Sequence, residues 1–84
     1  MIYESVYEHN GVRYGMTLGR WRYGAKNLHV ARFYDHKGSM VAQGTSDIGR
    51  ETAVSHAKGN LLKRFGSYAN DSLTLVGGSC DRVD

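Results

Sequence analysis

NGVRYGMTL, the segment at residues 10–18, carries the strongest structural signal of the chain. The Asn-Gly pair readily takes the positive φ angles that a tight β-hairpin turn requires. After the pair, Val12, Tyr14, Met16 and Leu18 recur at every second position, which is typical of a strand with one apolar face. The segment therefore predicts a hairpin turn followed by a strand that packs one face on the core.

Other strands are expected on both sides of this segment. Residues 2–8 alternate and are rich in Tyr and Val, which predicts the first strand of the hairpin. Gly19 interrupts the alternation on the other side and leaves open whether a β-bulge resets the side chains that follow. Residues 28–35 and 39–43 read as two further strands, because glycine-containing turns precede each of them. Short connections favour an antiparallel meander.

The hydrophobic period changes in the second half of the chain. Apolar residues three or four apart predict one long helix packed on the sheet, with a stripe of Ala53, Val54, Ala57, Leu61, Leu62 and Phe65. We expect Asp47 to cap the start of this helix and Gly66 to end it in the left-handed conformation. The opposite face, which includes His56 and Asn60, should lie in water.

The predicted fold class is therefore α+β: a three- to four-stranded antiparallel β-meander followed by one amphipathic helix packed on one face. At 84 residues the chain has the length of a single domain. We expect that domain at residues 1–68. The apolar residues Leu73, Leu75 and Val76 suggest a short edge strand within a C-terminal segment, residues 69–84, that otherwise reads as a tail.

Charge is distributed unevenly along the chain. The net charge is +3, but residues 10–66 contain ten Lys and Arg against three Asp and Glu, a net of +7. Both ends of the chain are acidic by comparison. A basic body attracts polyanions or acidic protein surfaces, although such charge can also serve solubility alone.

Residues that could support catalysis are sparse. Cys80 is the only cysteine, and no His pairs with another His or an acid at the helical spacing that metalloenzymes use. No phosphate-binding loop is present. We expect no enzyme activity, no metal and no cofactor. Residues 1–10 lack the basic residues of a signal peptide, and no apolar stretch is long enough to span a bilayer, so we expect a cytoplasmic protein without membrane contact.

The sharpest local feature is the run Arg20-Trp21-Arg22-Tyr23. Arg can contact phosphates and guanine edges, and Trp and Tyr can stack on unpaired bases. The same residue types dominate protein–protein hot spots, and in a third interpretation the aromatic residues belong to the core while the arginines are merely solvated. The candidate binding residues are Arg13, Arg20, Trp21, Arg22, Tyr23, Lys26, Arg32 and Tyr34.

A resemblance to known DNA-binding domains follows from the order of these motifs. The runs at residues 19–21, 29–38 and 51–53 (GRW, HVARFYDHKG and ETA) resemble the sheet-then-helix order of the amino-terminal arm-binding domain of phage integrases and of the AP2 domain. The resemblance covers roughly residues 11–65 and implies a sheet that enters the major groove of DNA. The strand at residues 2–8 and the residues around Gly24 depart from this pattern.

The chain also resembles, in general style, small single-domain accessory proteins of phages and mobile elements, among them anti-CRISPR inhibitors. We therefore expect a non-catalytic binding module for nucleic acid or a nucleoprotein complex. The alternative is a phage-type inhibitor that blocks a host nucleoprotein machine by protein–protein contact. The two differ in salt response, because phosphate contacts weaken steeply with salt. The sequence leaves a homodimer open.

Overall fold

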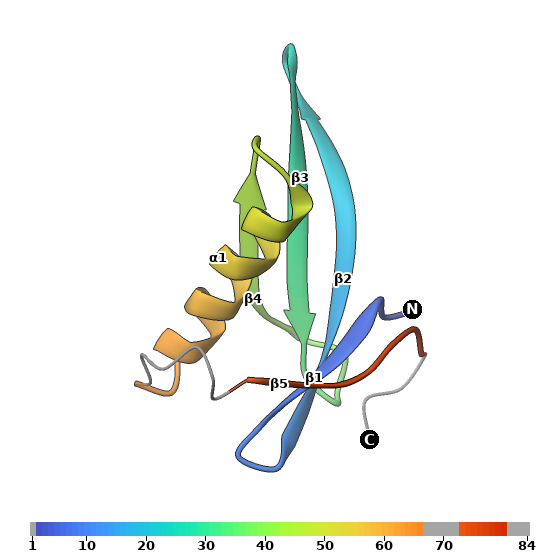
Figure 1. The fold of residues 1–84 in the computed structure, drawn as a ribbon, viewed down its shortest axis with the longest axis vertical. Coiled ribbons are helices and arrows are strands. Elements are labelled where there is room, and N and C mark those ends of the chain that lie inside the picture. Colours follow the sequence, from blue (N-terminus) through green and yellow to red (C-terminus); the bar gives the residue numbers. More distant parts are fainter. Residues whose placement is uncertain (1, 67–72, 81–84) are drawn as a thin grey trace.

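One antiparallel sheet and one helix make up the structure. The computed structural model describes residues 2–66 and 73–80. The elements are β1 Ser5–His9, β2 Val12–Tyr23, β3 Lys26–Tyr34, β4 Met40–Ser46, α1 Arg50–Lys63 and β5 Thr74–Gly77. The five strands form one sheet in the order β4-β3-β2-β1-β5, and α1 lies against one face (Figure 1). The α+β expectation, a meander and then a helix, is confirmed.

The expected C-terminal edge strand is also present. β5 pairs with β1, so that it extends the sheet that the meander forms. The rest of the segment expected as a tail lies partly outside the described residues, at 69–72 and 81–84.

Two glycine turns close the first two hairpins. Asn10 and Gly11 have φ angles of 51° and 80°, as a type I′ turn requires, and they join β1 to β2. Gly24 has a φ angle of 63°, whereas Ala25 stays outside the positive-φ region, which is the pattern of a type II′ turn between β2 and β3. Both turn types match the right-handed twist of paired strands.

β2 runs through Gly19 without a break, so the interruption suggested by the sequence is absent. Gly19 pairs with Val30, and the ladder between β2 and β3 keeps one register from Gly15 to Tyr23. The alternation is therefore not reset. Even-numbered side chains of β2 face α1, as Tyr14 and Met16 in the core show, and odd-numbered side chains face away.

Small residues bring α1 close to the sheet. Its buried stripe consists of Ala53, Ala57, Leu61 and Leu62, with Val54 half-buried beside them. The stripe packs on β3 and β4, where Phe33 is fully buried. A β-carbon at Gly44 would collide with backbone atoms of Ala53 and Ala57. Glycine at position 44 is therefore what allows the helix axis to approach β4.

The ends of the helix differ from expectation. Asp47 is not the cap: Gly49 holds the N-cap position, with no side-chain cap hydrogen bond. At the other end, i→i−3 backbone hydrogen bonds replace the helical pattern from Arg64 to Gly66. Phe65 therefore leaves the apolar stripe, is 45% exposed, and stacks on His9 with ring centroids 4.8 Å apart. Gly66 has a φ angle of 67°, in the left-handed region as expected.

The helix face expected to lie in water instead lies partly along the edge of the sheet. Asn60 Nδ2 donates to the carbonyl oxygen of Gln43 at 2.7 Å, and Arg64 Nη1 donates to that of Val41 at 2.7 Å. The ring Nδ1 of His56 lies 3.0 Å from the carbonyl oxygen of Thr45. Residues four apart in a helix are separated by about 6 Å along its axis, and residues two apart in a strand by about 6.6 Å. Side chains at every fourth position of α1 therefore match carbonyl groups at every second position of β4.

Candidate functional site

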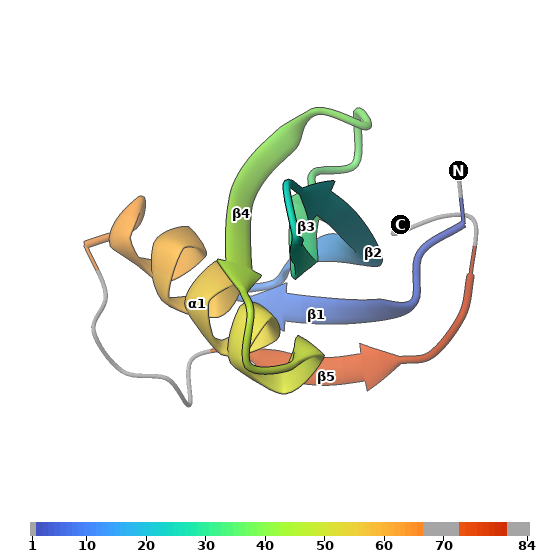
Figure 2. The ribbon, with the colours of Figure 1, turned by 90° about the horizontal axis from the view of Figure 1, so that it is seen from above.

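The hairpin of β2 and β3 extends beyond the rest of the sheet. β1 pairs with β2 only as far as Met16, and β4 pairs with β3 only from His29 onward. Residues 20–28 therefore project from the body, and we call them the hairpin arm (Figure 1). Seen from above, β1 and β5 run across the view while β2 and β3 appear nearly end-on, so the arm points away from the other half of the sheet (Figure 2).

One side of the arm is basic. Arg20 and Arg22 are on the side of the sheet that α1 occupies, and His29 pairs directly with Arg20. Arg50, at the start of α1, reaches the same place: Arg20, His29 and Arg50 help to line a hollow of about 140 Å³. We call Arg20, Arg22, His29 and Arg50 the arginine face.

The opposite side of the arm is aromatic. The alternation places Trp21, Tyr23, Lys26 and Arg32 on this side, and we call these four residues the aromatic face. Trp21 is 44% exposed and Tyr23 is 78% exposed. The interpretation that both rings belong to the core is therefore wrong. Large aromatic side chains that are exposed to water do not gain the free energy of apolar burial, which favours a role in contact with a partner.

Trp21 is held in place by a chain of two contacts. The guanidinium carbon of Arg32 lies 4.6 Å from the centroid of the Trp21 ring, within the range of a cation–π interaction. Arg32 Nε in turn donates to Gln43 Oε1 at 3.0 Å, across the β3–β4 ladder. The indole ring is thus positioned before any partner binds, which reduces the entropy lost on binding.

A second hollow, of about 200 Å³, lies beside Trp21 on the aromatic face. Gly19 contributes no side chain there, and a β-carbon added at Gly19 would meet no atom within 4 Å. The hollow is lined by Thr17, Leu18, Gly19, Trp21, Val30 and Arg32. It combines one aromatic wall, one apolar wall and two hydrogen-bonding side chains.

Two of the eight candidate residues lie away from the arm. Tyr34 packs on Tyr3 with ring centroids 5.9 Å apart, in a small cluster with Val6 and Cys80. Arg13 is exposed at the far end of β2, where it pairs with Glu8. The structure brings together Arg20, Trp21, Arg22, Tyr23, Lys26 and Arg32, on two opposite faces, and separates Arg13 and Tyr34 from them.

Sequence reasoning missed three residues at this site. His29 could have been found, because the turn at Gly24 fixes the pairing of His29 with Arg20. Arg50 and Gln43 come from other elements, and only the packing of α1 and β4 places them beside the arm.

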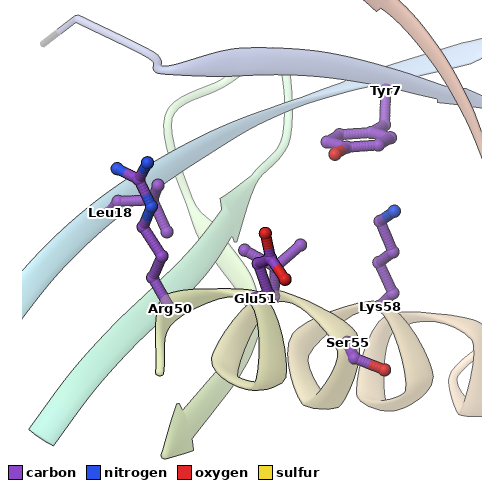
Figure 3. A pocket seen from close by; sticks show the side chains of 7 residues that line it. Tyr7, Leu18, Arg50, Glu51, Ser55 and Lys58 are labelled. Carbon is purple, nitrogen blue, oxygen red and sulfur yellow. The ribbon is translucent and has the colours of Figure 1, made fainter. Parts of the chain in front are cut away.

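A third hollow, of about 440 Å³, lies between α1 and β1 (Figure 3). Its lining includes Tyr7, whose ring centroid lies 4.6 Å from Lys58 Nζ. Glu51 stands between Arg50 and Lys58 in the figure, so charges of opposite sign offset one another. This hollow has no single charge sign with which to select a partner, unlike the arm.

Two titratable side chains with shifted pKa values lie below the arm. The backbone N–H of Ser39 and then that of Lys37 lower the pKa of Asp35, whose Oδ1 accepts both hydrogen bonds at 3.0 and 2.9 Å. Burial raises the pKa of Tyr14, with a further contribution from the charge of Asp35. Asp35 closes the β3–β4 turn and Tyr14 is in the core, so both groups serve the fold.

Residues 2–66 and 73–80 contain no group of three or more His, Cys, Asp or Glu side chains placed to hold a metal ion. The same residues contain no helix with the length and apolar character needed to cross a membrane.

Comparison of the chain with protein-family models, curated proteins and solved structures finds no match. The arm and its two faces are therefore the basis for assigning a function.

Proposed function

We propose that this protein is a non-catalytic module that binds nucleic acid, free or within a nucleoprotein complex, through the hairpin arm. The carrying observation is that residues 17–34 contain four Lys and Arg and no Asp or Glu, and that the part of this segment at residues 20–28, with Arg20, Arg22 and Lys26, projects from the body. Three cationic side chains on the projecting arm, with Arg32 at its base, attract a phosphate backbone at long range and contact it at short range.

The shape of the arm supports the same partner. A two-stranded β-ribbon has the width that the major groove of DNA admits, and exposed aromatic rings offer stacking surfaces to unpaired bases. The arm presents both kinds of contact on opposite faces. The single cysteine of the chain fits a reducing compartment, and we propose the cytoplasm as the place where this binding occurs.

The test is a salt series with labelled oligonucleotides. Fluorescence anisotropy gives the affinity of the protein for single-stranded and duplex DNA and RNA between about 50 and 200 mM salt. Replacing Arg20 and Arg22 together by Ala should reduce the slope of log K against log salt by about 1.8 for duplex DNA and about 1.4 for single strands, because two phosphate contacts are lost.

A matched control removes the same charge elsewhere. Lys37→Ala with Lys63→Ala takes two exposed cations from the β3–β4 turn and from the end of α1. This variant should keep most of the wild-type slope. Equal losses in the two double variants would show that the arm is not the contact surface. No binding at about 50 mM salt, with tens of micromolar protein, would refute the proposal and favour the protein-inhibitor alternative.

A further inference from the structure

The hollow beside Trp21 has the form of a slot for one flat group. Its floor is Gly19, where the absence of a side chain leaves the strand surface open. The Trp21 ring stands on one side, and Val30 lies across the strand from Gly19. Thr17 and Arg32 pair with each other across the ladder at the far end of the slot along β2, but the Arg32 side chain extends back, so that its guanidinium carbon lies 4.6 Å from the centroid of the Trp21 ring.

We propose that this slot binds a single unpaired nucleobase, stacked against the Trp21 ring beside the Arg32 guanidinium and hydrogen-bonded by Arg32 and Thr17. This inference rests on the proposed function and adds to it the class of nucleic acid: single strands, or loops and ends with exposed bases. A base inside a duplex already stacks on its neighbours, so its faces are closed to Trp21.

The chemistry of the slot suits a base. An indole ring stacks on any base, because every base has a π-face. Arg32 engages Gln43 through Nε, and its terminal NH₂ groups are chemically able to donate to the ring nitrogens and carbonyl oxygens of a base. The Thr17 hydroxyl can donate or accept. Lys26, on the same face, supplies a cation for the phosphates that flank the bound base.

The two faces of the arm then have different tasks. The arginine face supplies charge that acts on single strands and duplexes alike. The slot supplies stacking, which acts only on a base that has left its helix. A single-stranded nucleic acid bound at the slot would therefore bind more tightly than a duplex of equal charge.

Filling the slot tests the inference without removing any existing side chain. Gly19→Val places a branched side chain in the open space above Gly19, where even the first added carbon meets no neighbour. The Gly19 φ is outside the positive region and Val favours strands, so the fold should be kept. Single-strand affinity should fall about 5- to 150-fold, the equivalent of one stacked base, while duplex affinity should change less than about twofold.

Gly77→Val is the matched control. Gly77 is also in a strand with open space at the β-carbon position, but it lies in β5 at the other side of the sheet. This variant should bind single strands as the wild type does. Circular dichroism and thermal unfolding of both variants check that the fold is retained.

The fluorescence of Trp21 gives a direct readout, because Trp21 is the only tryptophan in the chain. A single-stranded oligonucleotide should quench its emission along the same curve that anisotropy gives. An oligonucleotide of equal length with abasic sugars keeps every phosphate and should bind more weakly, by the same 5- to 150-fold factor, and leave the emission nearly unchanged.

The outcomes separate the two proposals. Salt-dependent binding that Gly19→Val and abasic substitution leave unaffected, or a Trp21 emission that does not change at saturation, would overturn the slot while the proposed function stands. Failure of every oligonucleotide to bind at about 50 mM salt would overturn the proposed function, and the slot with it.

Discussion

Gly44→Ala should destabilise the protein more than its single added methyl group suggests. The new β-carbon would overlap backbone atoms of α1: the nitrogen of Ala57, the carbonyl oxygen of Ala53 and, at 2.8 Å, the carbonyl carbon of His56. Backbone atoms of a helix cannot rotate aside, so the helix must move away from β4. A shift of about 1 Å would cost each contact of the buried stripe up to about half of its dispersion energy.

The resulting cost is at the upper end of what overpacking produces, about 3 kcal/mol or more. For a domain of this length, each kcal/mol lowers the midpoint of thermal unfolding by about 4–8 °C, so a fall of about 12–24 °C is expected. The total stability of such a domain is about 4–13 kcal/mol, so the variant should be marginally folded. Thermal and urea unfolding followed by circular dichroism measure both quantities.

Gly59→Ala is the control for this substitution. Gly59 lies in α1, and a β-carbon there would meet no atom within 4 Å. The same chemical change should stabilise the protein by about 0.4–1 kcal/mol, because alanine favours the helix and restricts the unfolded chain. Stability of Gly44→Ala within about 1 kcal/mol of wild type would refute the reasoning that the close helix–strand approach depends on Gly44.

Two further predictions concern the core and the β3–β4 turn. Leu61→Ala should lower the free energy of unfolding in urea by about 2–5 kcal/mol, because Leu61 is fully buried. Phe65→Ala should cost clearly less than the roughly 3–5 kcal/mol of a core Phe, because Phe65 is 45% exposed. Equal costs for the two variants would contradict the placement of Phe65 outside the apolar stripe. The lowered pKa of Asp35 means that its contribution to stability is present above the pKa of the unfolded chain and is lost as the pH falls through the folded value. Asp35→Asn should therefore remove part of the loss of stability on acidification, and an unchanged pH profile of the unfolding midpoint would count against this role.

Much of the fold was predictable because it rests on local chemistry. The Asn10-Gly11 turn and the alternation after it required only the conformational preferences of those residues. The helical stripe required only its spacing. The end of the helix was predicted less well. Phe65 continues the helical spacing of apolar residues in the sequence, but the helix ends at Lys63, and this spacing does not indicate where a helix ends.

The candidate site was predictable only in part. Alternation placed Arg20 and Arg22 opposite Trp21 and Tyr23, but the open question at Gly19 left their faces unassigned. The ladder with β3 assigns them, because Gly19 pairs in register with Val30, a residue outside the local pattern around Gly19. Other groupings, such as Gln43 behind Arg32, depend on how β4 packs beside β3.

The side chains of α1 that reach along β4 have a consequence for how copies of this protein can associate. An uncovered edge strand is a template for another strand and a route to aggregation. His56, Asn60 and Arg64 occupy the outward carbonyl groups of β4, so that edge of the sheet is closed to a new strand. Among the described residues, β5 is the other edge strand of the sheet, and no strand pairs with its outer edge. Two copies that paired through β5 would form one continuous sheet with a β4 strand at each outer edge. Because both of these edges are covered, such a pair would be a closed dimer rather than a growing fibre.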